Sequence, residues 1–152
     1  MDLIIQIAIT GLTFVCMEAV AWLSHKYLMH GFLWFFHEDH HQHNTSLDPF
    51  ERNDFFFLLF AAPGILCLYI GVEEFTLFFW IGLGITIYGF AYFLIHDVFI
   101  HRRLKWLRNI DSAYFRAIRR AHKVHHKHFY KEDGECFGML WVPLRYLREE
   151  KK

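Results

Sequence analysis

The sequence has few of the features that mark secreted, disordered or nucleic-acid-binding proteins. Its only cysteines are Cys16, Cys67 and Cys136. They are odd in number, widely spaced and form no CxxC pair, so we interpret them as small buried hydrophobic residues rather than a disulfide framework. The formal net charge is zero, which gives no electrostatic basis for a nucleic-acid partner. A hydrophobic content of 55% excludes a disordered chain.

Basic residues are absent from the N-terminal segment. All sixteen Lys and Arg lie at or after position 26, so the chain lacks the basic start of a secretory signal peptide. Residues 3–23 instead form an apolar run about as long as a bilayer is thick. Further apolar blocks cover 55–72 and 75–100, with two glutamates between them. These runs predict an all-α integral membrane protein with about three transmembrane helices, four being possible, in a single domain over 1–152.

The distribution of positive charge predicts the topology. Under the positive-inside rule, the loops 24–54 and 101–152 face the cytosol, whereas the N-terminus and the two-glutamate turn face outward. One span precedes the first histidine-rich loop, and two more spans bring the chain back before the second. Both loops are therefore predicted to lie on the same, cytosolic side of the membrane.

Twelve histidines form two groups that repeat one spacing, HxxxxH followed by HxxHHxH. The first group comprises His25, His30, His37, His40, His41 and His43. The second comprises His96, His101, His122, His125, His126 and His128. Only the gap between the two motifs differs between the groups. A solvated histidine-rich loop keeps no such fixed spacing, so the repeat indicates a built site.

The spacing is that of metal ligands on helices. Residues i, i+3 and i+4 share one face of an α-helix, so each HxxHH triad is predicted to direct three imidazoles toward one point. Residues i and i+5 lie about 140° apart on an α-helix, so each HxxxxH pair requires a helix end or a break to converge, or serves different metals. Each half supplies enough imidazoles for one metal, and iron, zinc, copper and nickel all accept this ligand. A closed structural zinc site needs only four ligands, so ten imidazoles favour a dinuclear site open to a small molecule such as O2.

Three acidic residues are candidates for partners of these ligands. Glu18 lies in an apolar run two turns before His25, where a carboxylate either serves the site or joins two helices by a hydrogen bond. Asp97 follows His96 and either orients its imidazole or lies at the wet interface. Asp54 is the third candidate.

The C-terminal part is predicted to lie outside the bilayer. Residues 111–129 have the apolar and histidine spacing of an amphipathic helix, with Asp111 or Ser112 as its N-cap. Its basic face over 116–127 suits lipid headgroups or an acidic electron donor. The apolar tail 137–147 contains a proline and is too short to span, so we expect it to lie in the interface or to cover the site.

The motifs and their neighbouring residues resemble those of the bacterial β-carotene 3-hydroxylases, within the fatty acid hydroxylase and sterol desaturase superfamily. The matching stretches are HKYLMHGFLWFFHEDHH at 25–41, DPFERNDFF at 48–56, HDVFIHRR at 96–103, AHKVHH at 121–126 and ECFGML at 135–140. The resemblance spans most of the chain, from about Glu18 to about Pro143. His43 and His128 lie outside the family pattern, so the resemblance implies only the other ten histidines as metal ligands.

The resemblance implies a non-haem di-iron monooxygenase in the bacterial cytoplasmic membrane. Two Fe2+ ions and O2 would serve hydroxylation at C3 of the β-ionone rings of β-carotene, giving β-cryptoxanthin and then zeaxanthin. Ferredoxin or a similar protein would supply electrons, and the sequence itself has no nucleotide-binding fingerprint. The carotenoid would be bound from within the lipid bilayer.

Three other functions are compatible with parts of the pattern. A lipid, sterol or fatty-acyl hydroxylase or desaturase would use the same histidine site on another substrate. A metal transporter or sensor is disfavoured because transporters place ligands within the spans. A zinc hydrolase would need neither so many imidazoles nor a hydrocarbon substrate.

Overall fold

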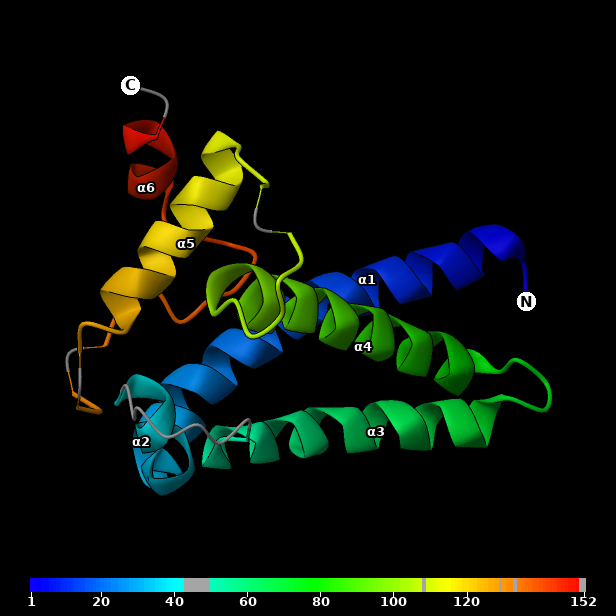
Figure 1. Cartoon of the computed structure of the whole chain (residues 1–152). Helices are drawn as coiled ribbons and strands as arrows, with labels where there is room; N and C mark the ends of the chain where they lie inside the picture. Colours follow the sequence, from blue (N-terminus) through cyan, green and yellow to red (C-terminus); the bar gives the residue numbers. More distant parts are fainter. Residues whose placement is uncertain (43–49, 108, 129, 133, 151–152) are drawn as a thin grey trace.

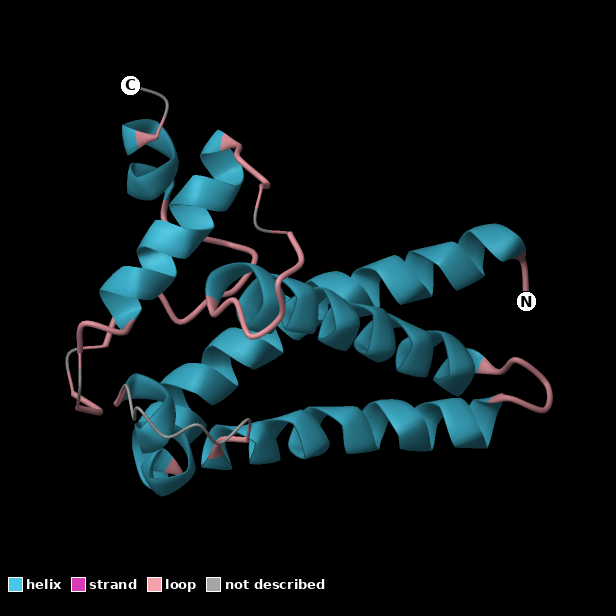
Figure 2. Cartoon of the chain, viewed as in Figure 1, coloured by secondary structure: helices cyan, strands magenta, loops and turns pink. Residues whose placement is uncertain are grey.

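The computed structural model describes residues 1–42, 50–107, 109–128, 130–132 and 134–150. Over these residues it contains helices and loops and no β-strand, as Figure 2 shows. The α-helices are α1 (Leu3–Leu23), α2 (Trp34–His41), α3 (Phe55–Gly71), α4 (Leu77–Phe93), α5 (Ala113–His125) and α6 (Leu144–Glu149). Shorter helical turns are η1 (Ser24–Phe32), η2 (Arg52–Asp54) and η3 (Leu94–Ile100). The predicted all-α fold is confirmed.

Three continuous helical segments of the described chain are long and apolar enough to cross a membrane. They cover Leu3–Phe32, Arg52–Gly71 and Leu77–Ile100. In Figure 1, α3 and α4 form a hairpin, and α1 packs against α4. The prediction of about three spans is confirmed, and the third continues past α4 into η3, which carries the second HxxxxH motif.

Glycines on α4 allow its two neighbouring helices to approach closely. A Cβ atom at Gly84 would lie 2.7 Å from the backbone oxygen of Thr10 and 2.7 Å from Cβ of Thr13, both on α1. A Cβ atom at Gly82 would lie 2.7 Å from the backbone nitrogen of Leu68 on α3. In lipid, helices associate by close packing rather than by exclusion of water, so small residues at these contacts stabilise the bundle.

The C-terminal helices form a separate layer beyond one end of the spans (Figure 1). The predicted N-cap Ser112 accepts a hydrogen bond through Oγ from the backbone N–H of Phe115 at 3.3 Å. Helix α5 ends at His125, earlier than predicted, and Phe129 lies outside the described residues. Its buried face packs against Val142 and Tyr146 of the tail and α6.

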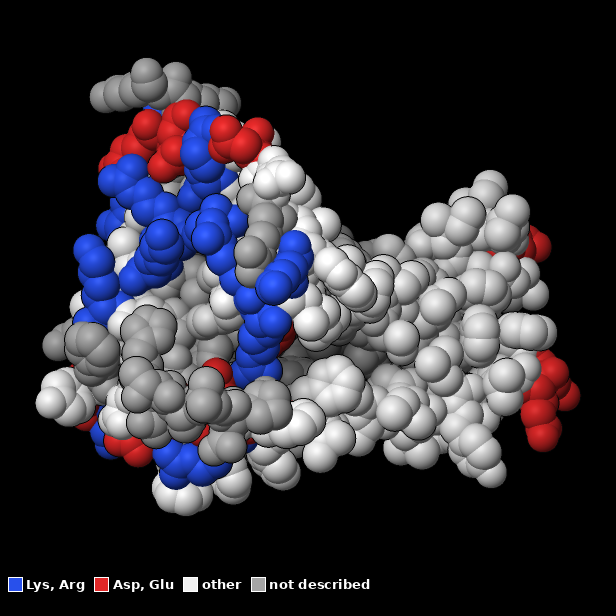
Figure 3. Space-filling model, in the orientation of Figure 1, with Lys and Arg blue, Asp and Glu red and all other residues white. Residues whose placement is uncertain are grey.

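Charge divides the molecule along the direction of the spans. In Figure 3, Lys and Arg gather at the end that carries the C-terminal helices, while the surface over the three spans is uncharged. The opposite end in this view carries acidic residues, in agreement with the two-glutamate turn between α3 and α4.

We predict that Gly84→Ala destabilises the protein and that Gly89→Ala does not. A methyl group at position 84 meets the α1 backbone and costs about 1–3 kcal/mol by overpacking. A Cβ atom at Gly89, on the same helix, meets nothing within 4 Å. Thermal unfolding of the two variants in one detergent measures the difference. Equal midpoints would contradict the assigned α1–α4 contact.

Candidate metal centre

Both HxxxxH motifs lie on π-helical turns rather than on α-helix. The backbone N–H of His101 donates to the carbonyl oxygen of His96 at 2.9 Å, which is the i to i+5 hydrogen bond of a π-helix. This bond places the two histidines one above the other on the same side of the chain. The π-helical turn η1 contains His25 and His30 in the same way, and its backbone departs from helical dihedral angles at Gly31 (φ −107°, ψ −124°). The predicted departure from α-helix at these motifs is confirmed.

The histidines converge from four segments into two adjacent clusters. In each cluster, one potential ligand atom per residue lies within 4.8 Å of all the others. The first cluster consists of His25, His30, His37, His41 and His125, all buried. The second cluster consists of His40, His101, His122 and His126. Nine of the ten motif histidines therefore lie in one of two potential metal positions.

The clusters do not coincide with the two halves of the sequence repeat. Each HxxHH triad gives its first and last histidine to one cluster and its middle histidine to the other, so His40 and His125 are exchanged. Helix geometry explains this, because residue i+4 lies about 40° from residue i whereas i+3 lies about 60° away on the other side. The expectation that all three imidazoles of a triad meet at one point is wrong.

His96 borders the second cluster. Its Nε2 lies 3.1 Å from Nε2 of His40, although it falls outside the tightest set of ligand atoms. Its ring is also adjacent to those of His101 and His122, with centroids 4.5 and 4.9 Å away. The structure therefore brings all ten motif histidines to one region at one end of the spans.

The hydrogen bonds of the first cluster determine which ring nitrogen carries the proton. His25 Nδ1 lies 3.0 Å from the carbonyl oxygen of Phe137, and His125 Nδ1 lies 2.8 Å from that of Glu135. His41 Nδ1 contacts the carbonyl oxygen of His128 at 2.9 Å, and His30 Nδ1 contacts that of Lys131 at 3.2 Å. A carbonyl oxygen only accepts, so Nδ1 donates in each pair and the neutral ring has its lone pair on Nε2.

In the first cluster these lone pairs face one another, and short distances between Nε2 atoms occur in both clusters. In the first cluster, Nε2 of His37 lies 3.0 Å from Nε2 of His25 and 3.2 Å from that of His41. In the second, Nε2 of His122 lies 2.9 Å from Nε2 of His101 and 2.8 Å from that of His126. Facing lone pairs repel unless a cation lies between them. The donor sets therefore fit a metal ion in each cluster, with the imidazole chemistry that iron accepts.

Burial keeps these imidazoles neutral. It lowers the pKa of His41 to about 4, with the neighbouring His30 adding to the effect, and that of His125 to about 2, with His41 adding to it. Burial likewise lowers the pKa of His40 and His122 well below the ordinary value, and nearby histidines lower it further. Neutral rings can bind a metal at neutral pH without first losing a proton.

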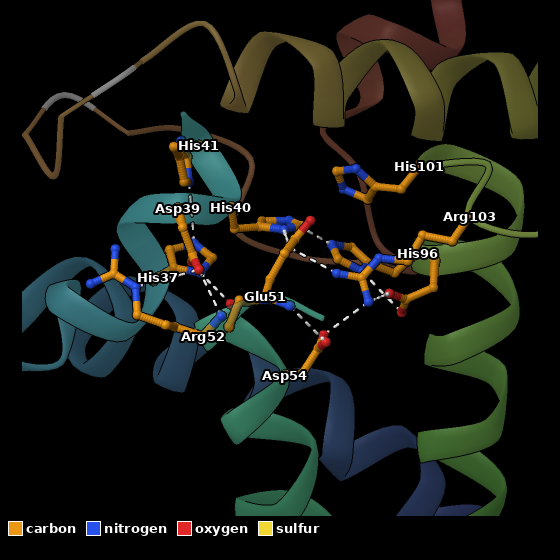
Figure 4. A network of polar contacts seen from close by, with 12 residues as sticks. His37, Asp39, His40, His41, Glu51, Arg52, Asp54, His96, His101 and Arg103 are labelled. Carbon is orange, nitrogen blue, oxygen red and sulfur yellow. Dashed lines mark hydrogen bonds and ion pairs between the residues drawn. The ribbon is translucent and has the colours of Figure 1, made fainter. Parts of the chain in front are cut away.

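Two side chains just before α3 orient imidazoles and were missed in the sequence. Glu51 Oε2 accepts from Nδ1 of His40 at 2.8 Å, and Asn53 Oδ1 lies 2.6 Å from Nδ1 of His37. Both belong to the DPFERNDFF stretch, so the resemblance at 48–56 was the available signal. Figure 4 shows Glu51 between His40 and Arg103, a further residue that the sequence did not reveal as part of the site.

The predicted acidic partners take different positions. Asp97 Oδ2 lies 3.3 Å from Nδ1 of His96, so the structure favours an orienting role. Asp54 contacts no imidazole in the described interactions. Its Oδ2 accepts from the backbone N–H of Glu51 at 3.0 Å, and its Oδ1 accepts from Arg103 at 2.9 Å. Asp54 therefore contacts Glu51 and Arg103 rather than an imidazole.

Glu18 joins α1 to the C-terminal tail and to α4. Its Oε1 accepts from the backbone N–H groups of Met139, Leu140 and Trp141 at 2.8, 2.9 and 2.9 Å. Its Oε2 accepts from the hydroxyl of Tyr88 at 2.7 Å. The structure thus favours the hydrogen-bonding alternative for Glu18. Its effect on the ligands is indirect, through the tail segment that covers the site.

The tail covers the first cluster, as one of the two predicted alternatives stated. The carbonyl oxygens of Glu135 and Phe137 accept from two cluster imidazoles, and the Phe137 ring lies 5.1 to 5.4 Å from those of His25, His30 and His125. His128, outside the repeated ligand set, contributes its backbone carbonyl. His43 lies outside the described residues.

The fold and the site thus define a protein with three helices apolar enough to cross a membrane and two adjacent histidine clusters at one end of them. The fatty acid hydroxylase model matches residues 10–144, and the chain belongs to this family.

Relatives with known names support this placement. Beta-carotene hydroxylase of Pantoea ananas is 38% identical over 135 residues, covering 89% of this chain and 76% of the relative. That of Pseudescherichia vulneris is 33% identical and covers 92% and 78%. The chloroplastic beta-carotene 3-hydroxylase of Gentiana lutea is 38% identical and covers 85% of this chain and 40% of the relative. No solved structure matches the chain.

Acidification is expected to destabilise the metal-free protein. Burial holds the pKa of His41 near 4 in the folded chain, below its ordinary value of 6.5, so the unfolded chain binds more protons below pH 6.5. The neutral His41 ring therefore contributes to the free energy of unfolding above about pH 6.5, and this contribution is lost as the pH falls toward 4. Thermal unfolding of metal-free protein at pH 7.5, 6 and 5 tests this, and a constant midpoint would contradict it.

Loss of the Glu18 carboxylate should destabilise the fold more than loss of its tyrosine partner. Glu18→Ala leaves three backbone N–H groups without their acceptor, each costing about 1–3 kcal/mol if it stays buried. Tyr88→Phe removes a single hydrogen bond to the same carboxylate. Unfolding midpoints in detergent compare the two variants. A midpoint for Glu18→Ala no lower than that for Tyr88→Phe would count against this anchoring role.

Proposed function

We propose that this protein is a membrane-bound, non-haem di-iron monooxygenase that hydroxylates C3 of the β-ionone rings of β-carotene. The products would be β-cryptoxanthin and then zeaxanthin. The observation that carries the proposal is the pair of clusters, one fully and one partly buried, in which imidazole Nε2 atoms face one another at the end of three apolar helices. The names of the similar proteins point to a carotenoid as the substrate.

The chemistry requires a metal because a ring C–H bond has no acidity that a base can use. Two iron ions bound by the clusters would supply activation of O2 for insertion of one oxygen atom into that bond. The first cluster would hold one ion through five imidazoles and the second would hold the other through His40, His101, His122 and His126, with His96 beside them.

The chain itself would orient the ligands and exclude water. Backbone carbonyl oxygens of the tail fix the ring tautomers of His25 and His125. The tail also covers the first cluster, where His41 and His125 are 0% exposed. A site closed to water protects a strong oxidant from side reactions.

The position of the clusters suits a carotenoid in the bilayer. Such a molecule is rod-like, apolar and about as long as the bilayer core is thick, roughly 30 Å. One ring would then lie near the interface when the other end reaches the opposite leaflet. Helices α1 and α4 continue directly into η1 and η3, so the first ligands lie where the spans end.

Electrons and oxygen would come from outside the chain. The proposal includes O2 as co-substrate and ferredoxin or a similar protein as donor, because the sequence carries no nucleotide-binding fingerprint. The excess of Lys and Arg around the clusters supports a cytosolic site in a bacterial cytoplasmic membrane.

A lipid, sterol or fatty-acyl substrate is the second candidate. The family model that matches the chain is that of fatty acid hydroxylases, and the histidine site would serve such a substrate equally well. Product identification distinguishes the two substrates.

Expression in a bacterium that makes β-carotene tests the proposal. Wild-type protein is expected to convert the pigment to zeaxanthin, as measured by chromatography. His40→Ala removes an imidazole from the second cluster, and His125→Ala removes one from the first. Each variant should lower the amount of product by more than about 100-fold, because loss of an outer hydrogen-bond partner alone costs 10- to 100-fold.

Gln42→Ala is the matched control, because this exposed, uncharged residue directly follows His41 and lies outside the basic face of α5. It should leave product formation unchanged. Unconverted β-carotene with wild-type protein inserted in the membrane would contradict the carotenoid assignment. Normal conversion by His40→Ala would instead contradict the assigned role of the second cluster.

A further inference from the structure

Arg103 connects three carboxylates next to the second cluster (Figure 4). Its Nη2 atom lies 2.8 Å from Oε2 of Glu51. Its Nη1 atom lies 2.9 Å from Oδ1 of Asp54 and 3.4 Å from Oδ1 of Asp97. Its backbone N–H also donates to the carbonyl oxygen of Asp97 at 2.9 Å. The guanidinium thus ties η2 to η3, two elements from different halves of the sequence.

Two of these carboxylates are themselves partners of histidines. The same Oε2 of Glu51 that contacts Arg103 accepts from Nδ1 of His40. Asp97 contacts Arg103 through Oδ1 and Nδ1 of His96 through Oδ2. A planar guanidinium fixes the direction of several carboxylates at once, which a lysine ammonium does not. The orientation of both imidazoles therefore depends on one side chain that touches neither of them in these contacts.

The first cluster is oriented differently. Its five Nδ1 atoms contact four backbone carbonyl oxygens and the amide oxygen of Asn53, all of them neutral. A carboxylate partner makes an imidazole a stronger electron donor to a metal than a neutral partner does. The two potential metal positions thus differ in electrostatic environment. Arg103 contacts the carboxylates beside the second position.

We propose that Arg103 is a positioning residue for the second cluster alone, acting through Glu51 and Asp97 to orient His40 and His96 and so making the two metal positions inequivalent. The inference rests on the proposed function, because it assumes that each cluster holds one metal ion.

Titration of the purified, metal-free, full-length protein in lipid nanodiscs with Co2+ tests this inference. Visible absorption follows binding, and metal content after gel filtration gives the stoichiometry. Wild type is expected to bind two Co2+ ions. Arg103→Gln should bind one ion as wild type does and the other about 10- to 100-fold more weakly, the usual effect of losing an outer partner of metal ligands.

Three further variants make the result specific. His122→Ala should weaken the same ion, which assigns that ion to the second cluster. Arg103→Lys keeps the positive charge but loses the planar guanidinium, so its affinity for the second ion should lie between those of wild type and Arg103→Gln. Lys105→Gln removes one positive charge from an exposed position of the same loop and should change neither affinity.

The possible failures are distinguishable. A wild-type protein that binds fewer than two Co2+ ions would contradict the proposed function itself. Two ions in wild type with unchanged affinities in Arg103→Gln would overturn only the role of Arg103. Equal weakening of both ions in Arg103→Lys or Arg103→Gln would mean that Arg103 supports the fold generally, which also overturns the inference. If Arg103→Gln does not fold, Arg103→Lys decides the same question, because it keeps the charge and leaves the first cluster unaltered.

Discussion

The structure depends on bringing ten imidazoles together, eight of them buried, with the Nε2 atoms of neighbouring rings only 2.8 to 3.3 Å apart. Such an arrangement is unfavourable for the chain alone, because the facing nitrogens repel and have lost their contact with water. Metal ions between the nitrogens would convert this repulsion into binding energy. The Nδ1 partners, the π-helical turns and the covering tail all serve to hold the rings in this orientation against that repulsion.

The helices bring the rings together by departing from regular α-helix where the histidines begin. The π-helical turns η1 and η3 bring each HxxxxH pair onto one side, where an α-helix would separate its members by about 140°. Because α2 and α5 each direct their middle histidine to the other side, His40 and His125 connect the halves of the repeat. Neither cluster is complete without a residue from the other half.

The two clusters share a ligand chemistry but differ in their support. Neutral oxygens, most of them backbone carbonyls of residues 128–137, orient the first cluster. Carboxylates that contact Arg103 orient His40 and His96 at the second. In the proposed function, this difference would allow two chemically similar positions to take different parts in the activation of O2.

The sequence by itself determined the helical class, the three apolar spans and the histidines that converge, because period, length and spacing are local properties. It also predicted that each HxxxxH pair needs a helix end or a break to converge, or else serves different metals. Only the tertiary structure decided how the triads divide between the clusters, since a ligand on one helix can face either of two neighbours. The partners of the rings were likewise decided by the fold. Any residue has a backbone carbonyl, so nothing in residues 131–137 marks them as acceptors, and Arg103 and Glu51 meet only after η2 packs against η3.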